Sequence, residues 1–292
     1  HQFSAVTPSS SGQPIYLFQS PHTRALTVGF IATQKNRPVF VPGRLHMGAL
    51  REQDTYQGTV ESLSLPPIRR LLTHHRPETI STVTVLRETL ACRLGSALAA
   101  VGISNHYGDA FIGASHIKGN GTIKTAYLYE NTEGLHPAGL WVIADSICLG
   151  RNLLATLTSL LKKYHPAHLL FLAPIASRVG INAIGALTAS HRIPTTFLAW
   201  GALFGVDKKT RYDMPWGHPD TEPLDQRDQH LFVSIYGPKL CMGGDFGNNY
   251  YCPTLAMKLY EDQLRQHNIT VHPVSAKDVA SRYQPGELVI RA

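Results

Sequence analysis

The sequence LWVIADSICLGRNLLATLTSLLKKY, residues 140–164, decides the expected fold. It opens with five apolar residues at 140–144, a run too short for a helix and typical of a strand buried on both faces of a parallel sheet. Asp145 follows the strand, and an amphipathic helix is expected at 152–164 after a loop that contains Gly150. In such a unit the helix amides and dipole attract a phosphate, while the acid can hold ribose hydroxyls or a magnesium ion. An ordinary strand-to-helix turn has the same outline.

The same alternation extends over residues 79–204. Strands are expected at 82–86, 110–114, 123–129, 140–144, 168–173 and 195–200. Helices are expected at 88–101, 152–164 and 178–189. Alternating strands and helices predict an α/β fold with a parallel sheet, helices on both faces and ligands beyond the carboxyl ends of the strands.

The flanking regions are less regular, so the chain divides into residues 1–78, 79–204 and 205–292. Residues 1–14 are expected to form a loose arm, with short strands at 15–18 and 25–32 that could pair as a hairpin. A helical segment at 50–72 is interrupted by Pro66-Pro67. Residues 205–253 read as long binding loops, followed by a helix at 253–266 and strands at 270–272 and 286–292.

Composition narrows the ligand class. The chain has 292 residues, 43% hydrophobic and 16% charged, with a formal charge of +7. This charge suits an anionic small molecule, and the absence of Arg/Lys runs or aromatic-basic repeats argues against nucleic acid. No apolar run is long enough to span a membrane, and the four cysteines and fifteen histidines lack metal-ligand spacing. A cytoplasmic, reducing location is therefore expected.

Four segments occur in an order known from one family. They are LREQDT at 50–55, VLRETL at 85–90, ADSICLGRN at 144–152, and VD at 206–207 with YDMPWGH at 212–218. They are similar to the family patterns L-R-D-x-x-T, I-L-R-A-G-L, D-P-M-L-A-T-G-G-S and D-x-x-L…Y-I-V-P-G-L-G-D. The chain thus resembles the type I phosphoribosyltransferases, and it looks like a divergent uracil phosphoribosyltransferase. The resemblance covers 50 to about 220 and makes residues 205–292 a base-binding hood with a C-terminal extension.

The resemblance implies transfer of ribose 5-phosphate from phosphoribosyl pyrophosphate, with magnesium, to a ring nitrogen of a base. It implies catalytic roles for Asp145, on the ribose hydroxyls, and Arg87, facing the pyrophosphate. The ligand-binding residues that it implies are Arg51, Gly150, Arg151, Asn152, Asp207, Tyr212 and Gly217. The family also implies a nucleotide or phosphoribosyl ligand and a homodimer.

The motifs depart from the family at several positions. T-G-G-[ST] is here Leu149-Gly150-Arg151-Asn152, the Ala-Gly pair after Arg87 is Glu88-Thr89, and the G-D of the hood is Gly217-His218. These changes leave two functions open. One is a phosphoribosyltransferase, a glycosyltransferase in the broad sense; the other is a catalytically degenerate homologue that acts as a sensor or as a protein-interaction or assembly factor.

Overall fold

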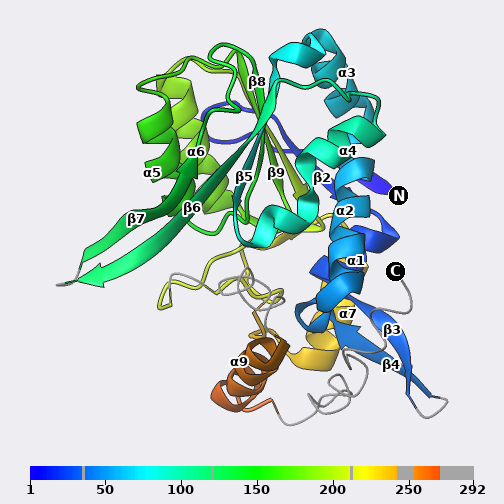
Figure 1. Cartoon of the computed structure of the whole chain (residues 1–292). Helices are drawn as coiled ribbons and strands as arrows, with labels where there is room; N and C mark the ends of the chain where they lie inside the picture. The colour runs from blue at the N-terminus through cyan, green and yellow to red at the C-terminus, as the bar shows by residue number, and fades with distance from the viewer. Residues whose placement is uncertain (35–36, 120–121, 211–212, 242–252, 270–292) are drawn as a thin grey trace.

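The computed structural model of the chain (Figure 1) describes residues 1–34, 37–119, 122–210, 213–241 and 253–269. Its largest element is an eight-stranded sheet with the order β1-β2-β11-β9-β8-β5-β6-β7. These strands are β1 (Gln2–Val6), β2 (Ile15–Gln19), β11 (Thr195–Trp200), β9 (His168–Ala173), β8 (Leu140–Ala144), β5 (Ile80–Leu86), β6 (Gly108–Gly119) and β7 (Thr122–Asn131). The six inner strands are parallel, and the edge strands β1 and β7 run antiparallel to their neighbours. The predicted α/β class with a mostly parallel sheet is confirmed.

The central strands have the bounds that their apolar runs predict. This holds for β8, β9 and β11, and every residue of Leu140–Ala144 is buried. The strands β5, β6 and β7 include the predicted segments but extend beyond them. Polar residues such as Ser81 and Asp109 continue these strands through main-chain pairing, which leaves no apolar signal in the sequence.

Helices cover both faces of this sheet (Figure 1). On one face lie α5 (Arg151–Leu160) and α6 (Arg178–Ser190), and on the other lie α2 (Gly48–Ser64), α3 (Pro66–His74) and α4 (Leu94–Ala100). The proline pair ends α2 as predicted, because it begins α3. The single helix expected at 88–101 is wrong: a 3-10 turn, η3 (Glu88–Cys92), is separated from α4 by Arg93 in the left-handed region at φ 47°.

The N-terminal region belongs to the main sheet, and the loose arm expected at 1–14 is wrong for Gln2–Val6. This segment is β1, whose Phe3 stacks on Tyr16 of β2 with ring centroids 5.3 Å apart. In turn, β2 pairs with β11, so the expected hairpin with residues 25–32 does not form. An exposed edge strand is stabilised by main-chain bonds and has little periodicity of its own. The main sheet thus extends across the boundary proposed at residue 78.

A smaller layer lies beyond the carboxyl ends of the parallel strands (Figure 1). Its elements are α1 (Pro21–Thr27), β3 (Gly29–Gln34), β4 (Arg37–Pro42), η1 (Gly43–Leu45), α7 (Gln226–Tyr236) and α9 (Pro253–Gln266). The predicted helix α9 is confirmed with identical bounds, whereas α7 was missed inside the segment expected to be irregular. The strands predicted at 270–272 and 286–292 lie outside the described residues. In the part of the chain that is described, no helix combines the length and apolar character needed to cross a bilayer.

Candidate functional site

The chain reverses its direction of travel across the sheet between β5 and β8. These strands are parallel neighbours, but the chain passes from β5 to β6 on one side and from β8 to β9 on the other. Open α/β sheets bind ligands beyond the carboxyl ends of the strands at such a point of divergence. Arg87 follows β5 and Asp145 follows β8, so the structure brings these two predicted residues to the same edge. Arg87 is exposed and Asp145 is half-buried.

The loop between β8 and α5 is fixed by its main chain. The amide of Ile147 donates to the carbonyl of Ile175 at 2.9 Å, and the amide of Ser177 donates to the carbonyl of Ile147 at 2.8 Å. Gly150 ends the loop at φ +70°, and an added Cβ would lie 3.2 Å from the carbonyl oxygen of Gly180. The loop therefore needs glycine at this position, both for its backbone conformation and for close packing on α6.

The first turn of α5 offers hydrogen-bonding groups to a ligand. Gly150 caps the helix without a side-chain hydrogen bond, so the first amides of α5 have no capping partner from that residue. Arg151 and Asn152 are the first two helical residues and are half-buried. The carboxamide oxygen of Asn152 is buried and has no hydrogen-bond partner among the residues that the structure describes. A buried oxygen without a partner and a helix start without a side-chain cap make the first turn of α5 a candidate site for a polar ligand.

Three other predicted ligand residues lie apart from this loop or outside the described chain. The Arg51 side chain is buried within the smaller layer, and its Nη1 donates to the carbonyl of His46 at 3.1 Å. Gly217 packs on Pro238, whose Cα would lie 2.3 Å from an added Cβ, so this glycine permits a close backbone approach. Tyr212 lies outside the described residues.

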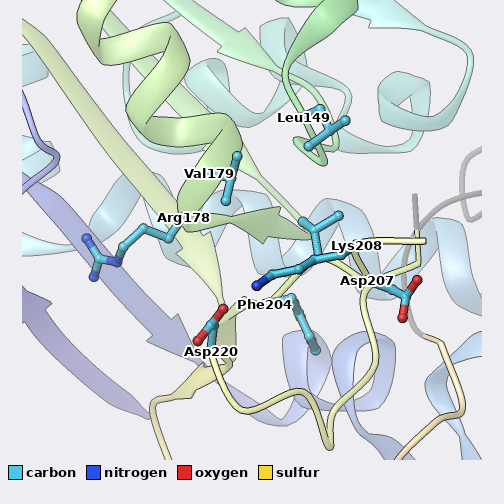
Figure 2. A pocket seen from close by; sticks show the side chains of 9 residues that line it. Leu149, Arg178, Val179, Phe204, Asp207, Lys208 and Asp220 are labelled. Carbon is cyan, nitrogen blue, oxygen red and sulfur yellow. The ribbon is translucent and has the colours of Figure 1, made fainter. Parts of the chain in front are cut away.

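A cavity of about 250 Å³ lies beside the loop (Figure 2). The residues that line it are Leu149, Arg178, Val179, Phe204, Gly205, Val206, Asp207, Lys208 and Asp220. They come from the β8–α5 loop, the start of α6 and the segment after β12 (Ala202–Phe204). Of the predicted site residues, Asp207 is among them. Arg178, Val179 and Lys208 were missed, although the rule that ligands bind beyond strand ends could have directed attention to the residues after β9 and β11.

Two titratable groups of this region have pKa values that their surroundings shift. The amides of Thr210 and Lys209 each donate to Oδ1 of Asp207 at 2.8 Å, and these bonds hold the pKa of Asp207 below its usual value. Burial raises the pKa of Cys148 to about 12, so this residue of the loop is a thiol at neutral pH and not a nucleophile.

The side chains of this region decide how a magnesium ion could be held. Among the described residues, no group of three or more His, Cys, Asp or Glu side chains could hold a metal ion. Magnesium on a phosphorylated ligand needs no such group, because it retains water and binds one or two carboxylates plus phosphate oxygens. Asp145, at the open end of β8, fits that smaller requirement.

Comparisons with known proteins give distant likenesses. No family model matches the chain, and neither does any curated protein. Among solved structures, the AQ2163 protein of Aquifex aeolicus is 16% identical over 56% of this chain and 79% of its own, with a TM-score of 0.41. The adenine phosphoribosyl transferase of Trypanosoma brucei, in complex with AMP, pyrophosphate and ribose-5-phosphate, is 12% identical over 68% and 87%, with a TM-score of 0.41. The orotate phosphoribosyltransferase of Aeropyrum pernix is 15% identical over 61% and 89%, with a TM-score of 0.33. Since the TM-scores are this low, no inference about this chain depends on these likenesses.

Proposed function

We propose that the chain binds a ribose-phosphate ligand, phosphoribosyl pyrophosphate or a nucleotide, at the carboxyl ends of β5 and β8. The observation that supports this most is the reversal of strand order between them, with Arg87 and Asp145 on the two sides. The loop that follows β8 closes on Gly150, whose positive φ leads directly into the first turn of α5. Acid, cation and uncapped helix amides at one edge suit ribose hydroxyls, pyrophosphate and a 5′-phosphate in that order.

Each residue has a distinct role in this proposal. Asp145 accepts hydrogen bonds from the ribose hydroxyls, and the first amides of α5 with Arg151 and Asn152 hold the 5′-phosphate. Arg87 faces the pyrophosphate, whose charge it offsets. Magnesium, when bound, would neutralise the pyrophosphate further. Neither Arg51 nor Gly217 contacts the ligand in this scheme, because Arg51 donates to the carbonyl of His46 and Gly217 packs on Pro238.

The reaction proposed at this site is displacement at the anomeric carbon. A ring nitrogen of the acceptor forms a bond to that carbon while the bond from the carbon to pyrophosphate breaks, and pyrophosphate leaves with the electron pair. The proton of the ring nitrogen passes to solvent. The protein positions the two reactants and stabilises the leaving charge, which requires no covalent intermediate. The cavity beside Leu149 holds the acceptor, because it adjoins the loop that holds the sugar.

One observation favours binding without transfer. Leu149 stands where the family has a threonine, and it directs an apolar side chain into the cavity wall (Figure 2). The loop thereby lacks one hydroxyl donor for the phosphate, and a hydrogen bond to a charged partner contributes about 1.5–3 kcal/mol. A sensor that holds the ligand but does not turn it over is therefore the second candidate.

Isothermal titration with phosphoribosyl pyrophosphate and magnesium tests the proposal. Wild type is expected to bind, and Asp145→Asn to bind at least about tenfold more weakly, because it loses a charged acceptor for two hydroxyls. Glu133→Gln, the same change of charge at an exposed residue, is the matched control. No heat with wild type at millimolar ligand, or equal affinities in all three proteins, contradicts the proposal. Pyrophosphate release with a panel of bases then separates transferase from sensor.

A further inference from the structure

Arg178 connects three segments at the edge of the cavity. It is the first residue of α6 and one of the lining residues. Its Nε and Nη2 donate to the two carboxylate oxygens of Glu222, and its Nη1 donates to the carbonyl of Thr7 at 2.9 Å. Figure 2 shows the guanidinium directed away from Lys208 and Phe204. The side chain therefore presents its aliphatic part near the cavity and uses its charge outside it.

The helix itself does not explain an arginine at this position. A cation in the first helical turn opposes the dipole by roughly 0.3–1 kcal/mol. Ser177 already caps α6, since its hydroxyl accepts a hydrogen bond from the amide of Gly180 at 3.0 Å. The favourable partner of Arg178 is Glu222, in a fork-to-carboxylate geometry that lysine cannot reproduce.

The pair spans a small sheet that carries the cavity walls. This sheet has the order β10-β12-β13, with β10 (Ala176–Ser177) and β13 (Glu222–Pro223) on opposite sides of β12. Arg178 directly follows β10, and Glu222 lies in β13 opposite Leu203. The ion pair therefore passes from one edge of this sheet to the other. The two walls it connects are the start of α6, with the exposed Val179, and the segment that runs from Phe204, the last residue of β12, to Lys208.

We propose that Arg178 and Glu222 are positioning residues that set the width of the acceptor cavity and so determine which acceptors fit. This rests on the proposed function, in which the cavity holds the acceptor. Arg178 touches neither the sugar nor the reacting atoms; it acts through Val179 and Phe204. The pair therefore affects acceptor binding and leaves the ribose-phosphate loop unchanged, because the main-chain bonds that connect this loop to Ile175 and Ser177 do not involve the Arg178 side chain.

The test measures two affinities in the full chain with Arg178→Met, Arg178→Lys and Glu222→Gln. Phosphoribosyl pyrophosphate with magnesium is titrated first, and its Kd is expected to stay within about twofold of wild type. The Kd of each base is then measured by titration, and KM and kcat where pyrophosphate is released. For Arg178→Met the Kd or KM of the preferred base is expected to rise about tenfold or more, because small misplacements of a wall have large effects on fit. Arg178→Lys is expected to restore this in part.

Controls and outcomes separate this inference from the proposed function. Arg76→Met removes an exposed arginine–glutamate pair away from the cavity and is expected to change nothing. The Glu222 side chain is 41% exposed, so water can solvate its carboxylate when Arg178 is replaced. If Arg178→Met does not fold, Glu222→Gln breaks the same ion pair and takes its place in the test. Unchanged base affinity and ranking in the folded variants overturns the inference alone. Equal loss of both affinities overturns it too, because the pair then maintains the whole fold. If wild type binds the sugar phosphate but no base, the cavity does not hold an acceptor and the inference is wrong. If wild type binds neither, the proposed function is wrong as well.

Discussion

Arg24 of α1 and Asp228 of α7 form an ion pair, with Nη2 of Arg24 2.7 Å from Oδ1 of Asp228. The other oxygen of Asp228 accepts a hydrogen bond from the side-chain amide of Gln19 at 2.7 Å. Asp228 is almost fully buried, with 8% of its side chain exposed, whereas Arg24 is one-third exposed. The pair joins α1 to α7, the helix that the sequence did not predict, and Gln19 connects Asp228 to the end of β2 in the main sheet.

We expect Arg24→Met to destabilise the protein by about 2–4 kcal/mol, because it leaves a buried carboxylate without its cation. Asp228→Asn should cost less, since the partly exposed Arg24 can be hydrated and asparagine still accepts a hydrogen bond. Urea unfolding gives both values. Arg227→Met, which breaks an ion pair of an 83% exposed arginine on the same helix, is the control and should leave stability nearly unchanged, because solvent screens an exposed pair. Equal effects of Arg24→Met and the control would show that burial of Asp228 is not what matters.

Gly150→Ala tests the loop geometry. Its φ of +70° disfavours a side chain, and an added Cβ would also lie 3.2 Å from Gly180 and Ile184. The expected cost is about 1–3 kcal/mol of stability, together with loss of affinity for phosphoribosyl pyrophosphate. Gly12→Ala is the control, because Gly12 has φ +81° but nothing within 4 Å of an added Cβ. It should show the backbone strain alone and full ligand affinity; a ligand affinity that Gly150→Ala leaves intact would count against phosphate binding at this turn.

Acid is expected to weaken the fold through His168, at the start of β9. Burial, with a smaller contribution from nearby His75, lowers the pKa of His168 from 6.5 to about 4. Between these two pH values the unfolded chain binds a proton that the folded chain does not. The contribution of His168 is therefore fully present above pH 6.5 and is lost as the pH falls toward 4.

Unfolding free energies measured from pH 7.5 down to pH 4.5 test this dependence. His168→Gln removes the titrating group, so its stability should fall less steeply with acid than that of wild type. A shift of one pKa unit corresponds to about 1.4 kcal/mol in a fully buried group. Because the ring of His168 is only partly buried, solvent reduces this effect, and the loss of stability in acid should differ between the two proteins by about 1 kcal/mol in total. His191→Gln, at an exposed histidine, should follow wild type. Parallel curves for wild type and His168→Gln would remove His168 as the source.

The sequence predicts the inner strands β8, β9 and β11 well, because they are runs of consecutive, mostly apolar residues that are buried on both faces of the sheet. Leu140–Ala144 is apolar throughout and buried throughout, so its strand and the turn after it could be located from composition alone. Placing Asp145 and Arg87 at one edge needed only the rule for parallel strands. By contrast, β1 is half-exposed and depends on pairing with β2, and α7 begins at an Asp225 cap inside a segment rich in turn residues. Contacts distant in the chain decide both elements.

The cavity was predictable only in part, for a similar reason. Asp207 belongs to a motif that can be recognised in the sequence. No neighbouring residue marks Arg178 as part of the cavity, because its partner Glu222 lies 44 residues away. Arg51 is a second example, because the family motif predicts that its charge binds the ligand. In the structure it is buried, and its guanidinium serves the carbonyl of His46 in the turn between β4 and α2. Local pattern identifies the β8–α5 loop, whereas the cavity walls beside it depend on tertiary pairing.

Leu149→Thr tests whether a hydroxyl in the β8–α5 loop strengthens the binding of a phosphorylated ligand. Leu149 lies in the β8–α5 loop and lines the cavity, at the position where the similar family has a threonine hydroxyl. A hydroxyl donated to a charged phosphate contributes about 1.5–3 kcal/mol, which corresponds to a gain of roughly tenfold or more in affinity. We therefore expect Leu149→Thr to bind phosphoribosyl pyrophosphate more tightly and, if positioning is the only deficit, to release pyrophosphate faster with a base. Val179→Thr adds a hydroxyl to the same cavity from α6, away from the loop, and should leave the affinity for phosphoribosyl pyrophosphate unchanged. Equal behaviour of the two variants would mean that the loop does not hold the phosphate, while tighter binding without faster release would favour the sensor over the transferase.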